Sequence, residues 1–169
     1  VGLQTFIRCH RKRSRSKSTI MRARRGGVTA FIYACAASLA AVCCEAKTVT
    51  YDFNVSWVHA NPDGLFESKV VGVNGQWPLP IIEVDKGDQL VVNMYNGLDR
   101  SATIHFHGMF QNGTNDMDGP AMVTQCPVPA GSSFTYNFTV NQNGTYWYHC
   151  HTDYCYPDGY RQALIVHDK

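Results

Sequence analysis

Four histidines form two His-x-His pairs, and this spacing is able to hold a metal. The first pair is His105 with His107, and the second is His149 with His151. In a β-strand, side chains at i and i+2 point to one face, about 6.5–7 Å apart along the chain. If the two strands are neighbours, four neutral imidazoles converge, and such a set suits copper or zinc better than calcium or magnesium. One such pair is often accidental, but two pairs beside aromatic residues indicate a metal site.

Cys150 lies between the two histidines of the second pair, which raises the alternative of a copper–thiolate site. The alternation of a strand sends Cys150 to the face opposite to His149 and His151. A copper–thiolate site usually has another histidine shortly after the cysteine, where this chain has Cys155. We therefore expect Cys150 to be a small buried side chain. A zinc site that uses Cys150 and Cys155 stays open, and no function is predicted for Cys155.

The basic charge of the chain is confined to its N-terminal segment. Residues 1–25 hold nine Lys and Arg and no acidic residue, whereas residues 47–169 hold six basic and twelve acidic residues. This distribution predicts no nucleic-acid binding by the folded part. Met21 and the arginines after it precede an apolar run over 28–44, which is typical of a secretory signal peptide. A membrane anchor is the alternative for this run.

We therefore divide the chain into three parts. Residues 1–20 are predicted to be a disordered upstream extension, residues 21–46 a signal peptide, and residues 47–169 one domain. Four Asn-x-Ser/Thr sequons follow residue 46, at Asn54, Asn112, Asn137 and Asn143. Together they predict a glycoprotein of the secretory pathway that is extracellular or displayed at the cell surface.

Three of the seven cysteines lie after residue 46, namely Cys126, Cys150 and Cys155. Because this number is odd, one of them either pairs outside the chain or stays free in an oxidising compartment.

Short apolar and polar alternations, broken by turn residues, predict an all-β domain. Eight strands are expected, at 48–58, 69–73, 81–84, 89–95, 102–107, 133–140, 145–151 and 162–167. This number and spacing indicate an antiparallel Greek-key sandwich or barrel. The segment 108–129 is too long for a hairpin loop, and such loops often carry function.

The two histidine motifs resemble those in the first cupredoxin domain of the multicopper oxidases. They read HFHG at 105–108 and WYHCH at 147–151. The resemblance continues in WVHANPDG at 57–64, VVGVNGQWPLP at 70–80, HFHGMFQNGTNDMDGP at 105–120, TQCPVPAG at 124–131 and YNFTV at 136–140. It covers about residues 48–168 and is greatest to fungal iron-uptake ferroxidases. It implies a cupredoxin-like Greek-key β-sandwich or barrel.

The resemblance also implies that this chain supplies half of a trinuclear copper cluster. His105 would bind the type 2 copper, His107 and His149 one type 3 copper, and His151 the other. Asp118 matches a family carboxylate that supports proton delivery during O₂ reduction. The alternative for Asp118 is a loop aspartate that makes a turn before a glycine.

The three cysteines compare differently with the family. Cys126 matches a family cysteine that commonly bonds to a cysteine of another domain. The family usually has Ser or Ala at position 150 and Gln at position 155, so the redox state of these two cysteines stays open.

The type 1 copper and the other cluster ligands of the family belong to a later domain. We therefore expect residues 47–169 alone to have no oxidase activity. O₂, a reducing substrate such as Fe(II) and the missing C-terminal cupredoxin domains would complete the enzyme, and an iron permease is a candidate partner. The alternatives are a domain of a laccase-like phenol oxidase and a free-standing, non-catalytic copper-binding module.

Overall fold

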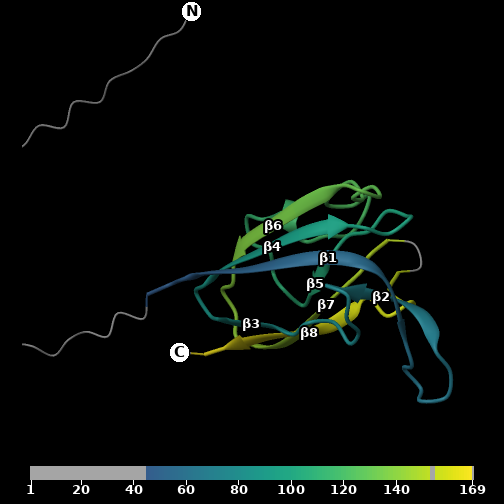
Figure 1. The fold of residues 1–169 in the computed structure, drawn as a ribbon. Helices are drawn as coiled ribbons and strands as arrows, with labels where there is room; N and C mark the ends of the chain where they lie inside the picture. Colours follow the sequence, from purple (N-terminus) through teal and green to yellow (C-terminus); the bar gives the residue numbers. More distant parts are fainter. Residues whose placement is uncertain (1–44, 153–154, 169) are drawn as a thin grey trace, which may run out of the picture. The chain divides into compact units, whose positions relative to one another are not determined.

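The regular elements of the protein form two four-stranded sheets in a computed structural model, which describes residues 45–152 and 155–168 (Figure 1). The first sheet has the order β2-β1-β4-β6, with β1 at Thr48–Ala60, β2 at Ser68–Val73, β4 at Gln89–Asn96 and β6 at Ser133–Thr139. The second has the order β3-β8-β7-β5, with β3 at Ile82–Asp85, β8 at Arg161–His167, β7 at Gly144–His149 and β5 at His105–His107.

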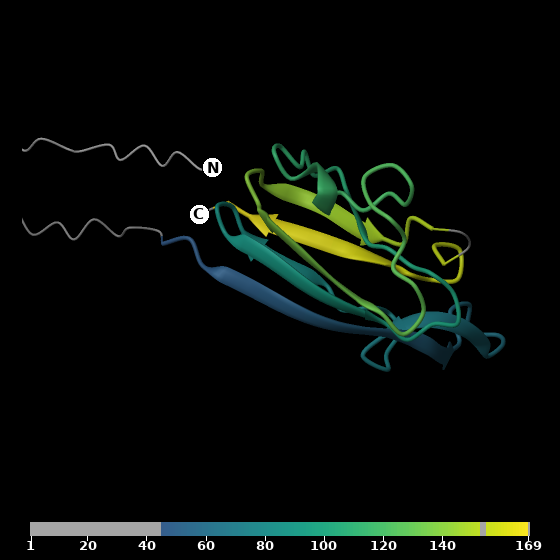
Figure 2. The same ribbon diagram turned by 90° about the horizontal axis from the view of Figure 1, so that it is seen from above.

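Period-two alternation explains why these segments are strands that bury one face. In β6, Tyr136 and Phe138 are buried while Thr135 and Asn137 are exposed. Figure 1 shows β6, β4 and β1 in one layer and β3 and β8 in the other, and Figure 2 shows β7 and β8 side by side. The core lies between the layers, and its largest fully buried side chains are Tyr136, Tyr148, Tyr160 and Phe106. Burial of this apolar surface is the main driving force that holds the two sheets together.

All eight predicted strands are present, but two details of the prediction were wrong. The sheets are mixed rather than antiparallel, because β1 pairs with β4 and β3 pairs with β8 in parallel. The histidine strands are also shorter than predicted. β5 begins at His105, although Ala102 makes an isolated bridge with Val128, and β7 ends at His149.

The predicted extension and nearly all of the predicted signal peptide lie outside the described residues. Among the residues that the structure describes, no helix is long and apolar enough to cross a membrane. The one helix there is a single 3-10 turn, η1, at Asn115–Met117.

Two buried polar side chains hold the chain that leads into β5. The Ile104 N–H donates to the Tyr136 hydroxyl at 2.8 Å. Asn96 is fully buried, and its amide nitrogen donates to the carbonyl oxygens of Arg100 and Val128 at 2.8 and 2.9 Å. Because buried polar groups are costly when unpaired, these bonds favour one path for residues 97–104.

Candidate metal centre

The register between β5 and β7 brings the two His-x-His pairs together. The strands are antiparallel, and His105 lies directly opposite His149. The ring centroids of these two residues are 5.2 Å apart, and the His107 ring lies 5.5 Å from that of His149. The two strands are therefore neighbours, which is the condition that the sequence-based metal-site hypothesis required.

The nitrogen atoms of three imidazoles are close enough together to form a candidate metal site. Ligand atoms of His105, His107 and His149 all lie within 4.8 Å of one another. The shortest of these separations is 3.3 Å, between His107 Nδ1 and His149 Nε2. Two nitrogens bound to one metal at about 2.0–2.1 Å with a tetrahedral angle lie about 3.3–3.4 Å apart. The spacing of His107 and His149 thus fits a metal held between them.

Backbone carbonyl oxygens fix the orientation of two of the rings. His149 Nδ1 lies 2.9 Å from the Cys150 oxygen, and His105 Nδ1 lies 2.7 Å from the Asp118 oxygen. A carbonyl oxygen only accepts, so Nδ1 of each ring must carry the proton and donate it. Each Nε2 is then an unprotonated lone pair, which is the form that binds metals.

A glycine allows the loop before β6 to approach β5 this closely. Asp118 ends the 3-10 turn η1, and Gly119 follows it with φ of +99°. A side-chain carbon on Gly119 would overlap the backbone oxygen of Ile104. Only a residue without Cβ permits this approach, which sets the Asp118 carbonyl against His105. The Asp118 carboxylate lies farther away, at 3.4 Å from His105 Nδ1.

Aromatic side chains line one side of the histidine cluster. The Trp147 ring lies 4.8 Å from that of His107 and 4.2 Å from that of His149. The Tyr156 ring lies 5.1 Å from that of His149. Burial lowers the pKa of His149, and the neighbouring histidines lower it further, so this imidazole is neutral at neutral pH. A neutral ring is able to bind a metal without first losing a proton.

His151 lies beside the cluster but does not join the three close donors. Its ring is 5.3 Å from that of His105 and 5.8 Å from that of His149, and its side chain is exposed. It follows the end of β7, so strand pairing does not place it. A depression of about 280 Å³ lies here, lined by His149, Cys150, His151, Thr152 and Tyr156. The cluster is therefore open on the side of His151.

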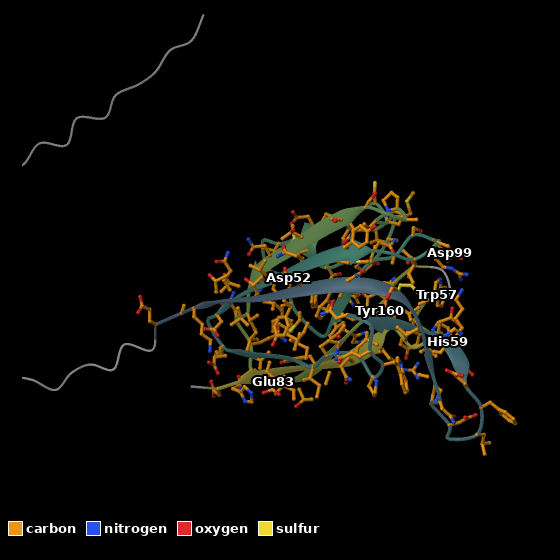
Figure 3. The ribbon with its side chains drawn as sticks, viewed as in Figure 1. Asp52, Trp57, His59, Glu83, Asp99 and Tyr160 are labelled. Atoms are coloured by element: carbon orange, nitrogen blue, oxygen red, sulfur yellow. A yellow bond between two sulfur atoms is a disulfide. The ribbon has the colours of Figure 1, made fainter. Side chains whose placement is uncertain are left out.

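Cys150 is buried as predicted, but it is not a lone thiol, because it forms a disulfide with Cys155 (Figure 3, yellow bond). The two Cα atoms are 5.8 Å apart, within the usual range for a disulfide. This bond removes both thiolates as ligands, which argues against the zinc site left open by the sequence. Cys126 is exposed and unbonded. The odd number of cysteines in the domain is thus explained by one pair and one single cysteine.

The disulfide closes a turn behind the metal centre. Buried Tyr160, labelled in Figure 3, donates its N–H to the Cys155 oxygen at 3.1 Å and accepts the Cys150 N–H at 3.0 Å. This turn returns the chain so that Tyr156 contacts the His149 ring. Sequence reasoning missed Tyr156 and the role of the Asp118 carbonyl. The MDGP glycine was the available signal for the carbonyl, whereas nothing local pointed to Tyr156.

Comparison with known proteins identifies the family. A family model described as multicopper oxidase matches residues 54–169, more than half of the chain. The chain belongs to the multicopper oxidase family. The family implies copper as the metal, and the three close histidines have the chemistry to bind it.

Several relatives of this multicopper oxidase chain are fungal. The iron transport multicopper oxidase fetC of Epichloe festucae is 63% identical over 124 residues, which are 73% of this chain and 20% of that protein. The iron transport multicopper oxidase FET3 of Gibberella zeae is 58% identical over 126 residues, 74% of this chain and 20% of that protein. Laccase-1 of Cryptococcus neoformans is 47% identical over 121 residues, 71% of this chain and 19% of that protein. The chain thus spans about one fifth of the length of these relatives.

Solved structures confirm the cupredoxin-like fold. Fet3p, a multicopper oxidase that functions in iron import, matches with a TM-score of 0.70 at 47% identity, covering 72% of this chain and 23% of that one. The laccase from Botrytis aclada matches with a TM-score of 0.69 at 38% identity, with the same coverage. The predicted fold class and family resemblance are therefore confirmed.

We expect Gly119→Ala to weaken metal binding by about 10–100-fold, the range for loss of a group that orients a ligand. The added methyl group would push the loop from Ile104 and withdraw the Asp118 carbonyl from His105. Copper titration of the full chain measures this effect. Gly113→Ala is the matched control, because it also changes a glycine with positive φ but meets open space. Equal affinities of the two variants would contradict the role given to the Gly119 approach.

Replacement of both bonded cysteines by serine should destabilise the domain by about 2 kcal/mol, the loop-closure value for so short a loop. Denaturant unfolding of the Cys150→Ser/Cys155→Ser variant measures this change. Cys126→Ser is the control, because Cys126 is exposed and unbonded. A double variant as stable as the parent chain would show that the disulfide does not stabilise the turn.

Proposed function

We propose that this chain is the copper-binding N-terminal domain of a multicopper oxidase that couples oxidation of Fe(II) to four-electron reduction of O₂ to water. The observation that carries this proposal is the 3.3 Å spacing of His107 Nδ1 and His149 Nε2, with His105 beside them. The fungal relatives named for iron transport support Fe(II) as the substrate.

We assign the ligands of a trinuclear copper cluster, of which this chain holds half. His107 and His149 share one type 3 copper, His105 binds the type 2 copper, and His151 binds the other type 3 copper. The close pair supports the first assignment, and the separate position of His151 agrees with a different ion. When bound, copper supplies the one-electron redox chemistry, and the protein orients the ligands.

The residues around the cluster orient ligands and handle protons. The carbonyl oxygens of Cys150 and Asp118 hold the His149 and His105 rings with Nε2 free. The Asp118 carboxylate is partly exposed and lies 3.4 Å from His105 Nδ1, so it is placed to pass protons between solvent and the cluster. Asp118 also ends the 3-10 turn η1 before Gly119. The turn role and the proton role can therefore belong to the same residue, because its carboxylate still faces His105 Nδ1.

A laccase-like phenol oxidase is the second candidate, because laccases are also among the similar proteins. Selection between Fe(II) and phenols would depend on later domains of the longer parent protein. A free-standing, non-catalytic copper-binding module is the third candidate, and it requires the half-site to bind copper either alone or across a symmetric interface with a second copy.

We further propose that the protein enters the secretory pathway, acts outside the cell or at its surface, and carries N-linked glycans. The predicted signal peptide and the four sequons support this proposal. All four sequon asparagines, at positions 54, 112, 137 and 143, are exposed in the structure. The proposed partners are the C-terminal cupredoxin domains of the parent protein and, for an iron-transport role, an iron permease.

Copper titration of the full chain tests the ligand assignment. We expect His107→Ala to lower the copper affinity by at least about 10-fold, because it removes one of the two closest donors. His59→Ala is the control, since His59 (labelled in Figure 3) is exposed on β1 of the first sheet, whereas the close donors lie on β5 and β7 of the second. If His107→Ala and the control bind copper equally well, the assignment is wrong.

We expect the chain alone to reduce no O₂, because the family resemblance implies that the electron-entry copper and the other cluster ligands are held by a later domain. Oxygen uptake by the copper-loaded chain with Fe(II) or a phenol measures this. The full-length parent oxidase is the positive control. Sustained O₂ uptake by the chain itself would contradict the proposal that it contributes only half of the cluster ligands.

A further inference from the structure

The outward face of the first sheet carries a depression of about 290 Å³ that has no part in the metal centre. It lies over β1, β4 and β6, where Figure 3 labels Asp52 on β1 beside β4. Six of its lining residues occupy neighbouring outward positions on the three strands: Asp52, Asn54, Asn93, Tyr95, Ser133 and Thr135. The volume is close to the lower end of about 300–1,000 Å³ for small-ligand sites.

Strand register arranges these six residues in two rows. One row runs from Asp52 across Asn93 to Thr135. The next runs from Asn54 across Tyr95 to Ser133. Cross-strand neighbours of this kind are close enough for their side chains to interact.

The first row is a chain of hydrogen bonds. The Asn93 amide nitrogen donates to Asp52 Oδ1 at 2.8 Å, and the Thr135 hydroxyl donates to Asn93 Oδ1 at 2.9 Å. These bonds hold the three side chains in fixed positions, and the row uses one of the two carboxylate oxygens of Asp52. The other oxygen is an acceptor that suits an amide N–H of a ligand.

The second row places a sequon asparagine beside an exposed aromatic ring. Asn54 is directly opposite Tyr95, which is 45% exposed. A Cβ built on Gly97 would lie 3.4 Å from Asn54 Oδ1 and 3.5 Å from Tyr95 Cε1. The Asn54 amide oxygen and the edge of the Tyr95 ring therefore both lie next to Gly97, which has no side chain.

The backbone of Asn54 is anchored by the residue that follows β2. Asn74 donates its N–H to the Asn54 oxygen at 2.8 Å and accepts the Asn54 N–H on its side-chain oxygen, also at 2.8 Å. Its amide nitrogen donates to the Asp52 oxygen at 2.9 Å. A group attached to Asn54 therefore starts from a rigid point on this face.

We propose that this face is a cradle for the N-linked glycan of Asn54. The first N-acetylhexosamine lies with its apolar face on the Tyr95 ring, and its acetamido group meets the row formed by Asp52, Asn93 and Thr135. The proposal rests on the proposed glycosylation but not on copper binding.

Attachment needs a diphosphate-linked lipid as sugar donor, which the secretory pathway supplies. The Asn54 amide nitrogen forms a bond to the anomeric carbon of the sugar. The bond from that carbon to the diphosphate oxygen breaks, and the diphosphate lipid leaves with the bonding electrons while the amide gives one proton to a base.

A second sequon on the same sheet face provides the contrast. Asn137 lies on β6, opposite Val91 of β4, and its side-chain oxygen accepts the Gln89 amide at 2.8 Å. No aromatic residue stands opposite Asn137 in this register. A glycan on Asn137 should therefore project into solvent, whereas that on Asn54 should be held against the sheet.

A double-mutant cycle in a glycosylating host tests the cradle with the full chain. The cycle compares the parent, Asn54→Gln, Tyr95→Thr and the double variant. A matched control cycle uses Asn137→Gln instead of Asn54→Gln. Mass spectrometry first establishes which asparagines are glycosylated. Tyr95→Thr should lower the midpoint of thermal unfolding by roughly 2–6 °C when Asn54 is glycosylated, and by much less in Asn54→Gln chains. The control cycle should show no coupling.

Proton NMR of a ¹³C-labelled glycan gives a second readout that does not depend on unfolding. Protons of the first sugar on Asn54 should shift upfield through the ring current of Tyr95 and lose this shift in Tyr95→Thr. The proposal would be overturned by any of three results: Asn54 carries no glycan, Tyr95→Thr has the same effect on unfolding with and without the glycan, or the ring-current shift is absent. It would also be overturned if Tyr95→Thr dissociated a dimer of the chain, because a second copy would then cover the face.

Discussion

The fixed register between β5 and β7 is the constraint on which the metal centre depends. A shift of one residue in an antiparallel pair would turn one set of imidazoles to the other face of the sheet. β5 has only three residues, so its own ladder supplies little of this specificity. The Ile104 bond to buried Tyr136 and the bridge from Ala102 to Val128 fix the chain just before it. The position of the first histidine pair is thus set from the core rather than from the strand.

The backbone contributes as much to the centre as the side chains do. Two carbonyl oxygens, from Asp118 and Cys150, select the tautomers of His105 and His149. Each carbonyl depends on a local device in the sequence. Gly119 permits the close approach of one loop, and the disulfide of Cys150 closes the turn after β7. The disulfide lies beside His149 and His151 in sequence, whereas Gly119 follows His107 by twelve residues, so the centre is built from the segments 105–119 and 147–156.

The strands could be predicted from the sequence, but the pairing between distant segments could be predicted less well. Period-two alternation and turn residues were sufficient for all eight strands, and the two His-x-His pairs pointed to the histidine cluster, whose copper binding stays a prediction. The parallel pairing of β1 with β4 could not be read from either strand, because direction is set by the connection and the common core. The disulfide partner of Cys150 was also missed. Strand alternation predicts which face Cys150 points to, but it does not predict the turn that brings Cys155 next to it.

The arrangement of nitrogen donors favours the proposed shared site over an independent one. Three imidazoles converge from β5 and the end of β7, and His151 extends the set on the exposed side. A structural metal site usually encloses its ion with four protein ligands, whereas an open coordination position is typical of a reactive site. Here the open side coincides with the depression beside His151 and Tyr156. Under the proposed function, ligands from another domain would enter there and complete the coordination without displacing the rings that β5 and β7 already hold.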